Sequence, residues 1–96
     1  MSELTLVSTQ KRPLRPLIEA ALANELRLLE AGIRRTEQRL QKFEQQRCMS
    51  TTEFISQYEN NELSETLELA EWVGEYRLLV RLREKVDALR GIRFAD

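Results

Sequence analysis

The amino-acid sequence predicts an all-α protein: an antiparallel helical hairpin of two long helices with a short connecting helix, dimerising into a four-helix bundle. Three observations lead to this prediction. Apolar residues recur at alternating gaps of four and three through the first half of the chain, a helix-capping motif follows near the middle, and both long segments carry charges in the same order. Together they describe amphipathic helices that need other helices to cover their apolar sides.

The composition removes several classes of site. The chain has 96 residues, enough for one small domain, with 42% hydrophobic and 32% charged residues, which is typical of a solvated helical bundle. One cysteine and no histidine leave no intramolecular disulfide, zinc site or Cys–His catalytic pair within a single chain. No apolar run approaches a membrane span or a secretory signal, so we expect a cytoplasmic protein without membrane association, metal or cofactor.

The first long helix is expected at about 16–47. Residues 1–15 are predicted to form an extended or flexible basic segment, because β-branched residues are followed by the proline-containing run KRPLRP. Pro16 suits the first helical position, where its missing N–H has no intrahelical partner. Residues 16–96 then form one helical hairpin domain.

A seam of apolar residues is predicted to join the helices, as in a coiled coil. Thr36 is its one polar member; such a residue costs stability but sets register, so replacing Thr36 with leucine is expected to raise the melting temperature. The predicted hairpin and dimer seam comprises Leu22, Leu26, Leu29, Ile33, Thr36, Leu40, Phe43, Leu69, Trp72, Tyr76, Leu79 and Val86.

The remaining helices are predicted at about 52–60 and 65–90. Ser50 and Glu53 have the spacing of a capping box, in which two side chains satisfy free N–H groups at a helix start. Ser64 is the expected start of the last helix, and Gly91 its C-cap. The apolar face of this helix is broad, which indicates contact with more than one neighbour.

Charge order and length constrain the assembly. Each long helix is acidic early and basic late, so an antiparallel arrangement places opposite charges side by side. The helices extend roughly 48 Å and 39 Å, whereas a compact chain of this size has a radius of gyration near ~13 Å. Two such rods leave apolar surface open, and a homodimer is expected to cover it.

Three groups of residues are candidates for function. An antiparallel hairpin is expected to gather cations at the end holding both termini, as a site for an acidic protein surface or a phosphate backbone, although acidic residues in the same region also fit ordinary surface charge. This candidate partner-binding set is Lys11, Arg12, Arg15, Arg83, Arg90 and Arg93. Direct nucleic-acid binding is the less favoured use, because the net charge is −1.

Carboxylates and aromatic residues form the other two groups. Glu65, Glu68, Glu71 and Glu75 are spaced to lie near one another, broadly similar to the acidic helices of all-α nucleotide pyrophosphohydrolases that hold Mg²⁺; a solvated, ion-paired face is the favoured interpretation. Phe43, Phe54, Tyr58, Trp72 and Tyr76 are expected to plug the bend of the hairpin. A binding patch anchored by Trp72 and Tyr76 is the alternative.

From Phe43 onward the chain resembles small all-helical antitoxin-type proteins of prokaryotic toxin–antitoxin pairs. The resemblance covers about half the chain and rests on Met49-Ser50-Thr51-Thr52-Glu53-Phe54, Glu62-Leu63, Glu71-Trp72 and Glu75-Tyr76. It implies a non-enzymatic protein–protein interaction module that binds and neutralises a partner toxin. The alternatives are a small nucleic-acid-associated regulator that uses the basic end, and a Mg-dependent pyrophosphohydrolase-like enzyme.

Overall fold

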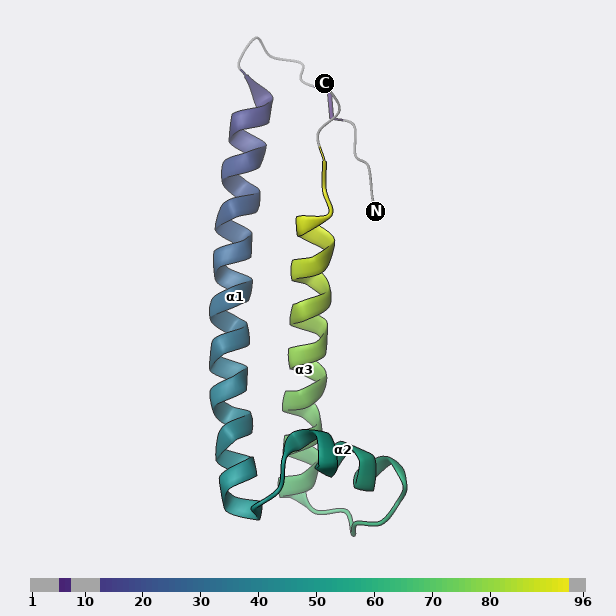
Figure 1. Ribbon diagram of the computed structural model, residues 1–96. Coiled ribbons are helices and arrows are strands. Elements are labelled where there is room, and N and C mark those ends of the chain that lie inside the picture. Colours follow the sequence, from purple (N-terminus) through teal and green to yellow (C-terminus); the bar gives the residue numbers. More distant parts are fainter. Residues whose placement is uncertain (1–5, 8–12, 94–96) are drawn as a thin grey trace.

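The computed structural model describes residues 6–7 and 13–93, and its regular structure consists of three helices. They are α1 (Leu14–Arg47), α2 (Thr51–Glu59) and α3 (Leu67–Arg90). The two long helices run antiparallel side by side, and the short α2 crosses the end where they are joined (Figure 1). The predicted all-α hairpin with a short connecting helix is therefore confirmed.

Helix α1 begins two residues before its predicted start at Pro16. Pro13 adopts an extended conformation (φ −60°, ψ 116°) and occupies the N-cap position, so Leu14 is the first helical residue. Pro16 then lies at the third helical position, which is compatible with proline because the first four N–H groups of a helix have no intrahelical acceptor. Residues 14 and 15, assigned to the N-terminal segment by the sequence, belong to the helix; residues 1–5 and 8–12 of that segment lie outside the described part of the chain.

The turn between α1 and α2 depends on two capping residues. Cys48 has left-handed backbone angles (φ 51°, ψ 43°), and its N–H donates to the carbonyl of Glu44. Ser50 Oγ accepts the N–H of Glu53 at 3.1 Å, as the capping motif predicts. Because Ser50 itself is the cap, α2 begins at Thr51 rather than at the expected residue 52.

Helix α3 begins at Leu67, two residues later than predicted. Its N-cap is Thr66 rather than Ser64, since Thr66 Oγ1 accepts the N–H of Leu69 at 3.2 Å. The helix ends at Arg90, as predicted, and Gly91 is its C-cap. Gly91 has right-handed helical angles (φ −82°), so this position does not use the conformational freedom of glycine.

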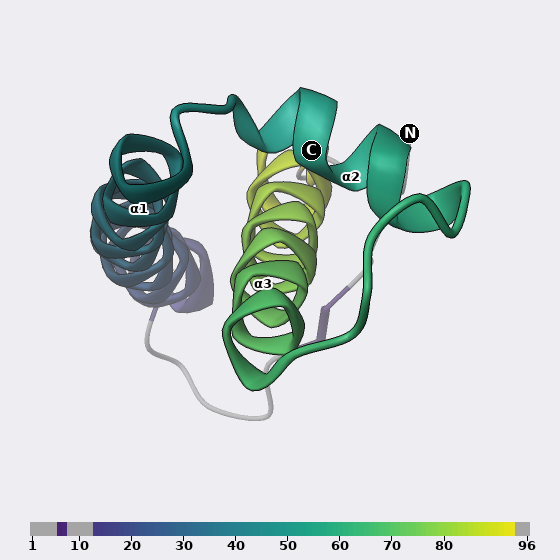
Figure 2. The same ribbon diagram turned by 90° about the horizontal axis from the view of Figure 1, so that it is seen from below.

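The core lies at the α2 end of the hairpin. Phe54 of α2 is fully buried and packs with α1 and α3 residues of the predicted seam, and Val73, which faces α2, is buried as well. Viewed along the helices, α2 lies against one face of the α1–α3 pair, and no described helix lies against the other face (Figure 2). The buried residues of the predicted seam are Leu29, Thr36, Leu40, Leu69, Trp72, Leu79 and Val86.

The N-terminal part of α1 extends beyond the end of α3 (Figure 1). Gly32 of α1 lies against Leu82 of α3, and Arg90 follows Leu82 by eight residues, so Leu26 lies beside the last turn of α3 and Leu22 lies just beyond its end. Both side chains are half-buried. The predicted seam is thus paired with α3 from about Leu26 onward.

Candidate functional site

Three aromatic rings close the bend of the hairpin. Trp72 lies between Phe54 and Phe43, with ring centroids 3.9 Å and 5.6 Å away and interplanar angles of 5° and 9°. The indole N–H of Trp72 donates to Thr51 Oγ1 at 3.0 Å, so its polar atom is satisfied inside the core. These contacts confirm the interpretation of the aromatic group as a plug. Trp72 is 1% exposed and is not available as a binding anchor, whereas Tyr76 is half-buried.

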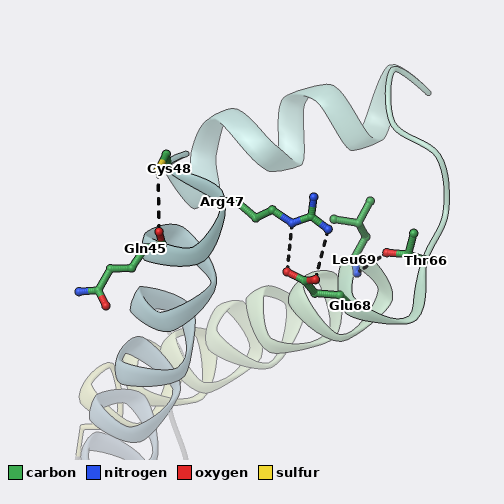
Figure 3. Close-up of polar contacts among 6 residues, drawn as sticks. All are labelled: Gln45, Arg47, Cys48, Thr66, Glu68 and Leu69. Atoms are coloured by element: carbon green, nitrogen blue, oxygen red, sulfur yellow. Dashed lines mark hydrogen bonds and ion pairs between the residues drawn. The ribbon is translucent and has the colours of Figure 1, made fainter.

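Polar contacts hold the same end of the hairpin together (Figure 3). Arg47 of α1 donates from Nε and Nη2 to the two carboxylate oxygens of Glu68 of α3, at 3.0 Å and 3.2 Å. Glu44 Oε2 accepts the N–H of Thr51 at 2.7 Å, which satisfies a free donor at the start of α2. The sequence analysis missed this role of Glu44, because a capping contact from seven residues upstream has no regular spacing.

A buried polar network crosses the middle of the hairpin. Thr36 is fully buried; its hydroxyl donates to the carbonyl of Gly32 at 2.8 Å and accepts from Arg39 Nη2 at 3.2 Å. Arg39 Nε lies 2.9 Å from Glu75 Oε2 of α3, and both atoms are shielded from solvent. The one polar residue of the predicted seam is therefore connected to an ion pair between the two long helices.

Four ion pairs link α1 to α3 along their length. Basic residues late in α1 meet acidic residues early in α3, and the reverse holds towards the other end, which confirms the antiparallel pairing predicted from charge order. The nitrogen–oxygen distances are 2.9 Å for Arg39–Glu75, 3.0 Å for Arg47–Glu68, 3.1 Å for Arg83–Glu37 and 3.7 Å for Arg90–Glu30. Exposed pairs of this kind contribute ~0–1 kcal/mol each, so they select the orientation more than they stabilise the fold.

The predicted partner-binding cations that the structure describes are not gathered at one end. Arg15 pairs with Glu19 of its own helix at 2.7 Å. Arg83 contacts Glu37, which lies about 33 Å further along α1 than Arg15 at 1.5 Å per residue. The prediction that Arg15 lies beside Arg83 was wrong because α3 ends well short of the start of α1. Arg90 is paired with Glu30, Arg93 is exposed, and Lys11 and Arg12 lie outside the described residues.

The carboxylate series of α3 is divided among different partners. Glu68 and Glu75 pair with arginines of α1, while Glu65 precedes the helix and accepts the Tyr58 hydroxyl at 2.8 Å. This hydrogen bond, reinforced by desolvation, raises the pKa of Tyr58 above its usual value of 10.0. Among the described residues, no group of three or more His, Cys, Asp or Glu side chains is arranged to hold a metal ion.

The face of the hairpin beside α2 carries shallow polar grooves. One groove has a volume of about 540 Å³ and is lined by side chains of all three helices, among them Glu37, Gln41, Thr52, Tyr76 and Arg83. A second, of about 340 Å³, continues towards the end of α3, and Arg34 and Arg83 line both. Tyr76 is thus the aromatic residue of the predicted binding patch that reaches this surface.

The face opposite α2 is richer in leucine. Gly32 of α1 lies against Leu82 of α3 there, since a Cβ on Gly32 would be 3.5 Å from Leu82 Cδ1. Leu78 and Leu89 lie one turn and two turns from Leu82 and are half-buried, whereas Leu28, one turn from Gly32, is 58% exposed. We call Leu28, Gly32, Leu78, Leu82 and Leu89 the leucine face.

Comparison with protein-family models, with curated proteins and with solved structures finds no match for this chain. None of the helices formed by the described residues is long and apolar enough to cross a membrane.

Proposed function

We propose that this chain is a non-enzymatic protein–protein interaction module that forms a homodimeric four-helix bundle and binds a partner protein. One observation carries the proposal: the hairpin is a rod whose leucine face is covered by no described element. Its dimensions are 60 × 22 × 18 Å and its radius of gyration is 18.9 Å, against about 12.5 Å for a compact chain of this length.

The exposed leucines support this use of the rod. A long helix packed against one other helix buries a single stripe, and side chains flanking the stripe remain in contact with water. Leu28 and Leu67 are 58% and 77% exposed, and Leu78, Leu82 and Leu89 are half-buried. Exposed apolar side chains on one face can mark interaction sites in soluble proteins, and pairing two hairpins into a bundle covers them.

The resemblance to antitoxin-type proteins supplies the proposed class of partner, a toxin protein. The residues that carry the resemblance act at the bend: Ser50 caps α2, Phe54 fills the core, and Trp72 packs on Phe54. They favour a shared hairpin architecture. The grooves beside α2, one of which is lined by the half-buried Tyr76, are the proposed binding surface for the toxin.

No contact in the described residues favours the basic-end regulator or the Mg-dependent enzyme. Arg83 and Arg90 form ion pairs with glutamates of α1, and Glu68 and Glu75 form ion pairs with arginines of α1. Both alternatives stay predictions from sequence.

Co-expression with the neighbouring gene tests the proposal. We expect an adjacent small open reading frame to arrest growth when expressed alone, growth to recover when this chain is co-expressed, and the two proteins to co-purify. Tyr76→Arg is expected to weaken the complex, whereas Arg77→Ala, an exposed neighbour on α3, is the matched control. A harmless neighbouring product that does not bind this chain contradicts the toxin-binding proposal.

A further inference from the structure

We propose that the leucine face is the self-association surface, and that the second copy docks about a two-fold axis parallel to the hairpin, so that α1 of each copy packs against α3 of the other. This inference rests on the homodimer of the proposed function and specifies its interface. The resulting bundle has antiparallel neighbours throughout, and it leaves the grooved face beside α2 free for a partner protein.

The two faces of the hairpin are distinguished by helical position. Residues of α1 that lie beside α2 include Glu37 and Glu44, which line the grooves. Gly32 and Arg39 lie on the other flank of α1, where they meet Leu82 and Glu75 of α3. Among the described residues, α2 is the only helix outside the hairpin pair, and it occupies the grooved side (Figure 2).

The shape of the leucine face suits a second copy. Three of the four leucines of this face, Leu78, Leu82 and Leu89, lie on α3, whereas α1 contributes Leu28 and, beside it, the small residues Ala31 and Gly32. A parallel two-fold axis places the large residues of one copy over the small residues of the other. Contacts between α1 and α3, such as Arg90–Glu30, show which residues lie at the same height along the hairpin. The parallel axis preserves these heights, so Leu28 of one copy lies near Leu89 of the other.

The charges bordering the leucine face are complementary in the same arrangement. Arg35 and Lys42 of α1, and Glu71 of α3, form no ion pair within the described part of the chain. All three are exposed at the end nearer α2. With α1 facing α3 of the second copy, Lys42 lies near the level of Glu71 and Glu75, which repeats between copies the charge order seen within the hairpin.

The alternative two-fold axis, across the helices, is less favourable. When this axis passes through the middle of the hairpin, α1 of one copy packs against α1 of the other. Arg35 of one copy then lies near Arg39 of the other, so that like charges meet. The size of the face is adequate for the preferred arrangement. Over the roughly 36 Å length of α3, a face 22 Å wide is close to the ~800 Å² that each partner contributes to a standard stable interface.

Directed disulfide formation between two differently tagged chains tests the arrangement. The background is Cys48→Asn, because Cys48 is exposed and asparagine tolerates its left-handed backbone. We expect the disulfide between an Ala31→Cys chain and a Lys85→Cys chain to form at least tenfold faster than the disulfide between two identical chains of either variant. Arg27→Cys mixed with Ala88→Cys is the control at a similar level, because both positions are exposed and point away from the leucine face.

Each result separates this inference from the homodimer on which it rests. Rapid Ala31→Cys self-crosslinking indicates that α1 packs against α1 and overturns the proposed axis. A dimer by sedimentation equilibrium with no mixed disulfide above the control overturns the proposed arrangement of the two copies and leaves the homodimer standing, whereas a stable monomer overturns both. A monomer that binds the co-expressed partner only when Leu28 is intact assigns the leucine face to that partner.

A second variant avoids dependence on crosslinking. Leu28→Lys is expected to weaken the dimer at least tenfold while retaining helix content, because Leu28 is already 58% exposed and is not needed for the core. Ala23→Lys, exposed on a different side of α1, is the matched control. Equal dimer affinity for the two variants contradicts the inference.

Discussion

Trp72 of α3 donates its indole N–H to Thr51 Oγ1, the first residue of α2, across 3.0 Å in the buried core. This bond ties the short helix to the hairpin at the point where Phe54 stacks on the same indole ring. It couples residues 21 positions apart, and both partners are buried, so the position of α2 depends on it.

Thr51→Val is expected to destabilise the protein by about 1–3 kcal/mol. Valine preserves the shape of threonine but removes the acceptor, leaving the buried indole N–H without a partner. The measurement is urea unfolding followed by fluorescence, since Trp72 is the single tryptophan of the chain. Thr52→Val, at the exposed neighbouring position, is the control, and equal stability of the two variants argues against the role of the bond.

Thr36→Leu is now expected to lower the melting temperature, contrary to the expectation from the seam pattern. The Thr36 side chain is fully buried and its hydroxyl contacts Gly32 and Arg39. A larger residue overpacks this site, at a cost of typically 1–3 kcal/mol. Thr36→Val removes the hydroxyl without a comparable increase in volume, and thermal unfolding measures both variants. A smaller drop in melting temperature for valine than for leucine identifies packing as the cause. A higher melting temperature for Thr36→Leu than for the unchanged protein contradicts the prediction.

The ion pair between Arg39 and Glu75 is expected to have a larger coupling free energy than the ion pair between Arg83 and Glu37. A double-mutant cycle with Arg39→Gln and Glu75→Gln should give about 1 kcal/mol, because the contacting atoms are shielded although the Arg39 side chain is 43% exposed. The same cycle at Arg83 and Glu37, with side chains 57% and 48% exposed, should give a few tenths of a kcal/mol and vanish at high salt. Equal couplings would show that local burial has no influence here.

Tyr58 is expected to make the protein less stable as the pH rises above about 10. Its pKa is raised in the folded state by the hydrogen bond to Glu65, so the unfolded chain loses the proton first. The stabilisation is complete below the unfolded pKa and is lost as the pH rises through the folded pKa. Tyr58→Phe should remove this part of the alkaline decline, and Glu65→Gln should reduce it; spectrophotometric titration of tyrosinate with parallel unfolding curves measures both effects.

The local structure of this chain was predictable because it depends on neighbours in sequence. The 4-3 spacing located α1, the capping motif located α2, and the order of charges predicted the antiparallel pairing of the long helices. Helix starts were misplaced by one or two residues, since several residues near each start are suitable caps and only the backbone path selects Thr66 over Ser64. The aromatic plug was also predicted, because few other positions offer large side chains for the end of a small bundle.

Only the tertiary structure decided how far α1 and α3 are shifted along one another, and this shift determines whether the predicted cations come together. Periodicity defines which side of a helix is apolar and says nothing about how far one helix slides along another. Because α3 ends well short of the start of α1, the predicted cation cluster separates into ion pairs, and Leu22 lies beyond the end of α3. The placement of α2 on one face leaves the leucine face without a covering helix among the described residues, and three-dimensional packing is what distinguishes that face from the grooved one.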